Sequence, residues 1–325
     1  MRLLALLLSL VALTVAAAPA PARAEKRIAF SFDDVPRGPG AFMTVEERTP
    51  RLIAALRRSG IRQAAFFVNP GHLSRPWGPG GEARIDAYVR AGHVIANHSF
   101  SHPSLSQIGP EAYLADIDQA TAWLQGRRGY RPWFRYPFLD EGTRGMPDMS
   151  VRDAVRAGLV QRRLLNGYVT VDSYDWYLDN LANTARREGR QMDMTALRDL
   201  YVRIIVETAE WQDRIARETL GRQPVQVLLA HETDLETMFL PDAVRALRVR
   251  GWRIATMDEA YRDPIARVTP ETRYLGGGRV TAIASAAGRN GRDLAPPLNE
   301  EATILRLFNE QVLHQPPAPA QESQP

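Results

Sequence analysis

The chain has 325 residues, of which 45% are apolar and 24% are charged, and its formal net charge at pH 7 is +4. This length suits one large domain or two of ordinary size, and a charge so close to balance gives no indication of a nucleic-acid partner. Cysteine is absent, which excludes disulfides and thiolate ligands, so any metal must bind to histidine and carboxylate side chains.

Residues 1–24 are typical of a secretory signal peptide. Arg2 precedes an apolar run from residue 3 to residue 18, and an A-x-A-like cleavage site follows at Ala24. A retained membrane anchor is the alternative, but the run is short for a bilayer span and no basic stop signal follows it. We therefore expect an exported protein, periplasmic or secreted, with no stable membrane span after signal removal.

From residue 26 to residue 257, β-rich runs alternate with helix-like segments. The expected strands are 28–32, 63–68, 93–97, 132–136, 167–171, 225–230 and 252–257. The expected helices are 45–58, 84–91, 110–126, 150–157 and 241–248. This alternation indicates parallel βα units, and about seven strands are compatible with a closed or nearly closed barrel. An open doubly wound sheet is the alternative, although no glycine-rich dinucleotide fingerprint follows the first strand.

Two segments depart from the alternating pattern. The charged stretch at about 177–223 predicts a helical insertion, with apolar positions from Met194 to Ile215 at three- and four-residue steps. It could pack on the outer wall of the barrel, or its start, near Tyr174 and Tyr177, could form a rim that selects substrates by size. We expect residues 264–312 to form a C-terminal extension, loop-like at first and then helical at 299–312, and residues 313–325 to be a disordered tail.

Polar residues gather at the C-terminal ends of the expected strands. Asp33 and Asp34 end the first strand, and His98 and His102 follow the third. The ends of the next three strands carry Arg135, Asp172, Asp175 and His231. In a βα barrel these ends form a single face, where catalysis takes place. The sequence therefore predicts an active site built from these residues.

The two histidines predict a metal site. Their four-residue spacing is that of one face of a helical turn, and two imidazoles with one carboxylate leave coordination positions open, as catalytic metal sites do. A cation there would make one aspartate of the pair a ligand and leave the other as a base for an activated water. Two unrelated histidines are the alternative interpretation.

Five short motifs, SFDD, H-S-x-x-H, R-x-P-F, D-W and L-x-H, occur in this order in the chain. In these motifs, over roughly residues 26–263, the sequence resembles the polysaccharide deacetylases, the family with the NodB homology domain (carbohydrate esterase family 4). The resemblance implies an α/β fold, a distorted and incomplete (β/α) barrel at about 25–263. It also implies a metal-dependent hydrolase that removes N- or O-linked acetyl groups from a carbohydrate, with zinc favoured over cobalt, nickel or manganese.

The resemblance implies a role for each matched residue. Asp33 corresponds to the general base, and Arg135 to the arginine that orients it. The metal ligands correspond to Asp34, His98 and His102.

The remaining matched residues complete the implied site. His231 corresponds to the general acid and Asp175 to the carboxylate that holds it, with Asp172 left as an alternative. The backbone N–H of Phe138 corresponds to a donor to the oxyanion. The residues that correspond to the lining of the acetyl pocket are Trp176 and Leu229.

One departure from the family pattern concerns the loop after the aspartate pair. Val35 replaces the glycine that family members commonly carry before the proline, and RGPGAF follows, so we expect a reshaped loop beside the cleft. Two other functions stay open: hydrolysis of a small cyclic amide or formamide on the same fold, and a non-catalytic carbohydrate-binding barrel. An open groove would favour a polymer, and a lid formed by the insertion would favour a small ligand. The sequence indicates neither the polymer, nor protein partners, nor the oligomeric state.

Overall fold

The structure is a computed structural model that describes residues 25–315. The expected signal peptide and residues 316–325 of the expected tail lie outside the described residues. The strands are β1 (Lys26–Val35), β2 (Ala65–Val68), β3 (Val94–Asn97), β4 (Tyr130–Phe134), β5 (Leu165–Asn166), β6 (Val171–Asp172), β7 (Val225–His231) and β8 (Trp252–Ile254).

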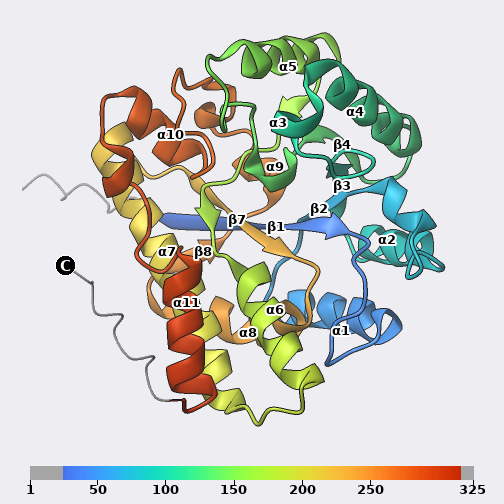
Figure 1. The fold of residues 1–325 in the computed structure, drawn as a ribbon, viewed down its shortest axis with the longest axis vertical. Coiled ribbons are helices and arrows are strands. Elements are labelled where there is room, and N and C mark those ends of the chain that lie inside the picture. Colours follow the sequence, from blue (N-terminus) through green and yellow to red (C-terminus); the bar gives the residue numbers. More distant parts are fainter. Residues whose placement is uncertain (1–24, 316–325) are drawn as a thin grey trace, which may run out of the picture.

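The α-helices surround the sheet on both sides (Figure 1). They are α1 (Val45–Arg58), α2 (Gly81–Arg90), α3 (Leu105–Ile108), α4 (Pro110–Leu124), α5 (Ser150–Gln161), α6 (Asp175–Arg187), α7 (Met194–Leu220), α8 (Asp234–Val249), α9 (Met257–Ala260), α10 (Arg279–Ala286) and α11 (Glu301–Leu307). In the view of Figure 1, α1, α6, α8 and α11 lie below strand β1, and α3, α4, α5 and α10 lie above it. None of the helices in residues 25–315 is long and apolar enough to cross a membrane.

All strand pairs of the sheet are parallel, in the order β5-β4-β3-β2-β1-β7-β6, and β8 also pairs with β1. Strand β1 is central because its first residues pair with β8 and its last residues pair with β2, while β7 runs along its other edge. The first and last strands of this path do not pair with each other in the described chain. The prediction of an incomplete (β/α) barrel is therefore confirmed.

The expected strand at 167–171 was wrong in detail, because the chain leaves the sheet there. The short strand β5 pairs with β4, and β6 pairs with β7 on the far side of the barrel. Gly167 lies so close to Phe67 that an added Cβ would approach the ring to 2.7 Å. Only glycine fits such a close approach, and a glycine of this kind often marks an interruption of regular strand pairing. The expected strand at 167–171 is therefore replaced by the two short strands β5 and β6.

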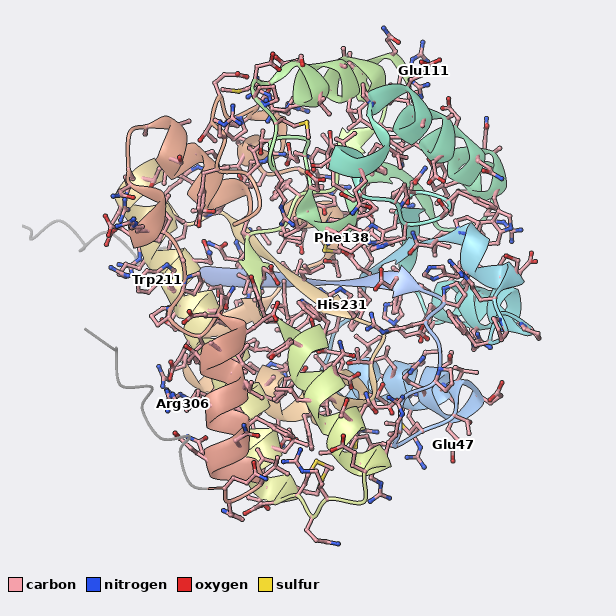
Figure 2. The ribbon with its side chains drawn as sticks, in the orientation of Figure 1. Glu47, Glu111, Phe138, Trp211, His231 and Arg306 are labelled. Carbon is pink, nitrogen blue, oxygen red and sulfur yellow. The ribbon has the colours of Figure 1, made fainter. Side chains whose placement is uncertain are left out.

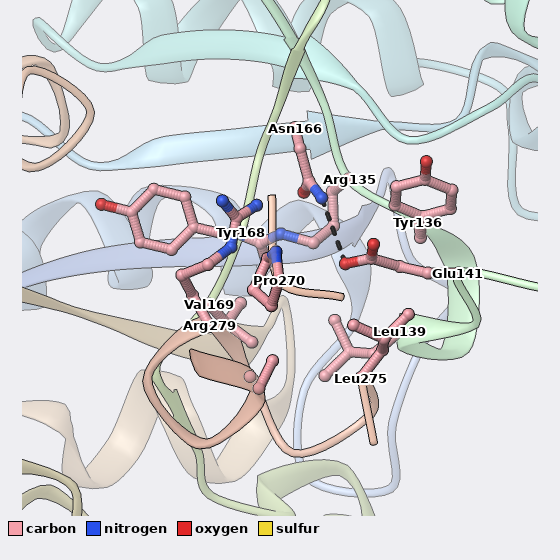
Figure 3. Close-up of a pocket in the computed structure, with 12 residues that line it drawn as sticks. Arg135, Tyr136, Leu139, Glu141, Asn166, Tyr168, Val169, Pro270, Leu275 and Arg279 are labelled. Atoms are coloured by element: carbon pink, nitrogen blue, oxygen red, sulfur yellow. Dashed lines mark hydrogen bonds between the residues drawn. The ribbon is translucent and has the colours of Figure 1, made fainter. Parts of the chain in front are cut away.

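The C-terminal extension lies against this opening. The backbone N–H of Arg279 donates to the carbonyl of Val169 at 2.7 Å, and Figure 3 shows the Arg279 side chain beside Val169 and Tyr168. A void of about 20 Å³, the size of a water molecule, remains between the extension and Arg135. The segment at 279–286, expected to be a loop, is helix α10, because Val280, Ala282 and Ala284 bury one side of it in the core.

Local sequence explains where two helices begin. Helix α1 has the predicted bounds, and the Thr44 hydroxyl and the Glu47 carboxylate form a capping box at its start. Helix α8 begins seven residues before the expected start at Pro241, because the Thr233 side chain caps it by accepting from the N–H of Glu236 at 3.2 Å. Pro241 lies inside the helix.

The predicted insertion is helical and forms part of the core. The expected apolar stripe of α7 is buried from Leu197 to Ile215, whereas Met194 at its start is 39% exposed. Leu178, Ala182 and Ala185 of α6 are also fully buried. Both helices therefore pack as ordinary crossover helices on the barrel.

Candidate active site

A cleft of about 340 Å³ opens at the C-terminal ends of the strands. Figure 2 shows two of its residues, Phe138 and His231, near the centre of the molecule. The residues that line it are Asp33, Asp34, Arg37, His98, His102, Tyr136, Phe138, Leu139, Arg144, Asp172, Tyr174, Trp176, Leu229, His231, Gly276 and Glu301. Of the ten residues predicted for the site, eight line the cleft, and Arg135 and Asp175 lie directly behind it.

Asp33 is held by a buried arginine. Arg135 Nη1 donates to both carboxylate oxygens of Asp33 at 3.0 and 3.1 Å, and its Nη2 donates to the hydroxyls of Ser31 and Tyr261 at 3.1 Å. Its guanidinium also lies 4.2 Å from the centre of the Phe67 ring. Burial lowers the pKa of Arg135, but the Asp33 carboxylate and the Tyr261 hydroxyl together outweigh that effect and the pKa is raised. Arg135 therefore stays charged and fixes the orientation of Asp33.

Three ligand-type side chains converge beside this pair. The donor atoms of Asp34, His98 and His102 all lie within 4.8 Å of one another. Asp34 Oδ1 is 3.1 Å from His102 Nε2 and 3.5 Å from His98 Nε2. Burial raises the pKa of Asp34, but the two imidazoles outweigh it and hold the pKa well below its usual range. Asp34 is therefore a carboxylate at neutral pH.

The arrangement of these atoms fits a cation. His98 Nδ1 lies 2.9 Å from the carbonyl oxygen of Arg135, and because a carbonyl can only accept, Nδ1 carries the proton. In the neutral ring, Nε2 then turns its lone pair toward Asp34 Oδ1. That buried oxygen has no hydrogen-bond donor among residues 25–315. His98 Nε2 and Asp34 Oδ1 are thus two acceptors that face each other, as two ligands of one metal ion do. In metal sites the second nitrogen of a ligating histidine, here Nδ1, is commonly held by a hydrogen bond.

The expectation that His98 and His102 share a helical turn was wrong. Both lie in a loop after β3, and Ser99 and His102 have φ of 69° and 61°. The loop is closed by the Ser99 hydroxyl, which accepts from the His102 N–H at 3.0 Å, and by Asn97 Oδ1, which accepts from the Ser99 N–H at 2.7 Å. The imidazole rings of His98 and His102 are therefore brought together by hydrogen bonds between side chains and the loop backbone, and not by a helical turn.

His231 is paired with Asp175. His231 Nδ1 is 2.9 Å from Asp175 Oδ1, and the His231 backbone N–H donates to Asp175 Oδ2 at 2.8 Å. Burial lowers the pKa of His231, but the adjacent carboxylate outweighs burial and raises it to about 9. Asp172, the alternative partner, lines the cleft instead, and burial raises its pKa to about 6. His231 is therefore protonated at neutral pH.

Aromatic and apolar side chains form the walls of the cleft. Phe138 is 54% exposed, and its ring lies edge-on to His102 at 4.5 Å between centroids. Trp176 and Leu229 also line the cleft, and Trp176 contacts Tyr174 at 6.0 Å between ring centroids. Flat aromatic faces beside polar groups are suited to sugar rings.

Strained backbone concentrates around the cleft. Six non-glycine residues in or beside it have φ between 49° and 69°: Asp34, Ser99, His102, Phe138, Leu139 and Tyr174. Each such residue costs on the order of 1–3 kcal/mol, and such strain is typical of functional sites because the surrounding structure must hold it.

Several residues of the site were not found from the sequence. Ser31 and Tyr261 complete the partners of Arg135, while Arg37, Arg144 and Glu301 line the cleft. For Ser31, its position two residues before Asp33 on the same strand was a usable signal, because alternate residues share a face. Glu301 lies 70 positions after His231, the last motif residue, and no local pattern marks it.

The predicted insertion does not cover the cleft. Tyr174 and Trp176 precede it, and no residue of 177–223 lines the cleft in the described structure, Tyr177 included. The C-terminal extension contributes Gly276 and Glu301 instead. Part of the cleft wall therefore comes from a segment that lies outside the five motifs.

Comparisons with known proteins point to one family. Residues 20–159 match the family model described as polysaccharide deacetylase. Over 110 residues, 34% of this chain, the sequence is 27% identical to a peptidoglycan-N-acetylglucosamine deacetylase of Bacillus cereus. Over 159 residues, 46% of this chain, it is 29% identical to chitin deacetylase 1 of Cryptococcus neoformans var. grubii. The matched segments span 35% and 28% of those two proteins.

Among solved structures, a family 4 carbohydrate esterase from Streptomyces lividans in complex with acetate aligns with a TM-score of 0.46 at 21% identity. The alignment covers 73% of this chain and 97% of that one.

Proposed function

We propose that the protein is a hydrolase that removes acetyl groups from a carbohydrate, because residues 20–159 match the family model described as polysaccharide deacetylase. The observation that carries the proposal is the meeting of three elements in one cleft. These are the base candidate Asp33 with its arginine, the acid candidate His231 with its carboxylate, and the convergent donor atoms of Asp34, His98 and His102.

We propose that Asp34, His98 and His102 bind one divalent cation, with zinc the favoured metal because two imidazoles and a carboxylate suit it. When bound, such a cation lowers the pKa of a coordinated water and polarises the acetyl carbonyl oxygen. The fit is supported by the orphaned Asp34 oxygen and by the protonated Nδ1 of His98, which leaves Nε2 free to act as a ligand.

The protein's own residues supply the proton transfers. Asp33 accepts a proton from the attacking water as the new carbon–oxygen bond forms. The backbone N–H of Phe138 is the proposed donor to the oxyanion that develops on the carbonyl oxygen. His231, protonated at neutral pH, donates a proton to the leaving nitrogen as the carbon–nitrogen bond breaks, and the products are acetate and an amine. For an O-linked acetyl group, the same proton goes to the leaving alkoxide.

The remaining predicted residues have positioning roles in this proposal. Arg135 orients Asp33 through two hydrogen bonds, and Asp175, paired with His231 Nδ1, keeps the ring in the orientation that leaves Nε2 for the cleft. Trp176 and Leu229 line the cleft and would enclose the acetyl methyl group.

The shape of the cleft favours a carbohydrate over a small cyclic amide or a formamide. A small ligand would be favoured by a lid from the insertion, yet no residue of 177–223 lines the cleft in the described chain. Exposed Phe138 and the Tyr174–Trp176 pair offer flat faces beside it. A non-catalytic barrel would have no use for a buried arginine on Asp33 and a carboxylate on His231.

The test is acetate release from a panel of N- and O-acetylated glycans, with a cyclic amide and a formamide included. The protein is first stripped of metal by a chelator and then assayed with and without added Zn²⁺. Acetate released only from glycans and only with metal is the expected result. Equal release from the stripped protein, or turnover of the small amides alone, would contradict the proposal.

We further propose that residues 1–24 direct export and are removed, and that residues 25–263 form the catalytic domain. Mass spectrometry of the protein recovered from the periplasm or medium should give a chain that begins at Glu25.

A further inference from the structure

The loop after β1 carries an arginine into the cleft. Arg37 Nη1 donates to Asp34 Oδ2 at 2.7 Å, and 24% of the Arg37 side chain is exposed. Arg37 belongs to the RGPGAF segment that departs from the family pattern. Its guanidinium contacts a residue of the proposed metal site directly.

The ion pair divides the two oxygens of Asp34. Oδ2 is taken by the guanidinium, whereas Oδ1 faces the imidazoles of His98 and His102 and has no donor in residues 25–315. A carboxylate whose second oxygen is held in this way is oriented to bind a cation through one oxygen. Hydrogen bonds from outer groups to metal-ligating carboxylates commonly set ligand orientation.

The backbone of Arg37 is itself held by buried charges. Its N–H donates to Glu232 Oε2 at 2.9 Å, and its carbonyl accepts from Arg48 Nη2 at 2.9 Å. Glu232 also accepts from the Tyr88 hydroxyl at 2.6 Å, and Arg48 forms a buried ion pair with Asp234 at 3.3 Å. Buried charges of this kind are stable only with well-placed partners, so this network fixes the path of the loop.

The loop that carries Arg37 passes so close to Asp234 that only glycine fits at position 40. An added Cβ at Gly40 would lie 1.9 Å from Asp234 Oδ2, and the same oxygen accepts from the Phe42 N–H at 2.9 Å. A side chain at this position would push the loop away from Asp234. Arg37 is therefore presented by a segment whose conformation is set in part by Glu232, which is 195 positions away in the sequence.

Three carboxylates of the proposed catalytic and metal sites each have a cationic partner. Asp33 is paired with Arg135, and Asp175 with His231. The third pair, Asp34 with Arg37, links residues only three positions apart.

We propose that Arg37 is a positioning residue of the metal site, whose guanidinium holds Oδ2 of Asp34 and leaves Oδ1 alone to bind the cation. The inference rests on the proposed metal site. Without Arg37 the carboxylate can rotate and offer both oxygens, so the site loses its preset geometry.

The test measures metal binding without substrate. Zn²⁺ affinity of the stripped protein is determined by competition with a chromophoric chelator, for the wild type, Arg37→Ala and Arg37→Lys. We expect Arg37→Ala to bind Zn²⁺ about 10–100-fold more weakly, as is typical when a group that orients a ligand is lost. Arg37→Lys retains one charged donor and should fall between the other two.

The visible spectrum of the Co²⁺-loaded proteins reports the coordination itself. A second carboxylate oxygen raises the coordination number and weakens the cobalt absorption, so Arg37→Ala should absorb more weakly per bound Co²⁺ than the wild type. Arg51→Ala, which removes an exposed arginine of α1, is the matched control and should bind both metals like the wild type. Circular dichroism checks that each variant is folded.

Arg37→Ala protein with unchanged or tighter Zn²⁺ binding would overturn the inference. Weaker binding with an unchanged Co²⁺ spectrum would overturn it as well, because the orientation of Asp34 would then not depend on Arg37. If the wild type itself binds no metal, the proposed metal site fails first and the inference fails with it. Should Arg37→Ala fail to fold, the same two measurements on Arg37→Lys decide the question.

Discussion

Replacing Asp175 by asparagine tests the assignment of His231 as general acid. The Asp175 carboxylate raises the pKa of His231 to about 9, whereas burial alone lowers it. Without that charge, the pKa should fall to the ordinary histidine value of about 6.5 or below. A drop from about 9 to about 6.5 corresponds to about 3 kcal/mol, for a side chain that is 13% exposed.

This change predicts how the rate depends on pH. A general acid must be protonated, so kcat/KM of the wild type should fall as pH rises through about 9. In Asp175→Asn the fall should begin near pH 6.5 or lower. At pH 8 about nine-tenths of the wild-type histidine is protonated but only about 3% of the variant's, which gives about a 30-fold loss from protonation alone. At pH 5.5 that part of the loss should nearly vanish.

The assay is kcat/KM for acetate release between pH 5 and 10, with bound metal measured for each variant. Asp172→Asn is the control, because Asp172 lies in the cleft without a hydrogen bond to His231 among the described contacts. In Asp172→Asn, the fall of kcat/KM at high pH should occur close to the pH at which it occurs in the wild type. The reasoning would be refuted if Asp175→Asn lowered kcat/KM by the same factor at every pH and kcat/KM still fell only near pH 9.

Three further predictions concern the same site. Asp33→Asn should lower kcat by about 10²–10⁴-fold, the usual worth of a general base, with Zn²⁺ still bound in equilibrium dialysis; a near-normal rate would exclude Asp33 as the base. His98→Ala should bind no stoichiometric metal by elemental analysis while circular dichroism shows a folded barrel, and metal retained at wild-type affinity would contradict the ligand assignment. The His231–Asp175 pair should also stabilise the fold. Because the folded pKa of His231 is raised to about 9, the difference in thermal stability between wild type and Asp175→Asn should be complete below about pH 6.5 and disappear above about pH 9; a difference that grows with pH would show the opposite linkage.

Local sequence determined much of the architecture and most of the cleft residues. The alternation of β-rich runs and amphipathic segments predicted parallel βα units because side-chain periodicity reflects which face of an element is buried. The polar residues that end these runs lie at one face, since parallel strands all end at the same side of a barrel. The helix-like pattern predicted the bounds of α1, and its start is fixed by the Thr44–Glu47 capping box, which involves only neighbouring residues.

Tertiary structure decided how these residues are connected. The sequence favoured Asp175 as the partner of His231 and left Asp172 as the alternative, and only the approach of β7 to the start of α6 places Asp175 on His231. His98 and His102 meet through a loop closed by Asn97 and Ser99 rather than through a helical turn.

Part of the wall of the cleft was also beyond local reasoning. Glu301 reaches it because α11 packs on α6, and the backbone of Arg37 is held by Glu232, 195 positions away, as well as by Arg48 of α1. Periodicity and capping depend on neighbours within a turn or two of the chain, so a sequence pattern can display them. Contacts between residues 100 or more positions apart depend on how the sheet curls and where its opening is covered, and those follow from the packing of the whole chain.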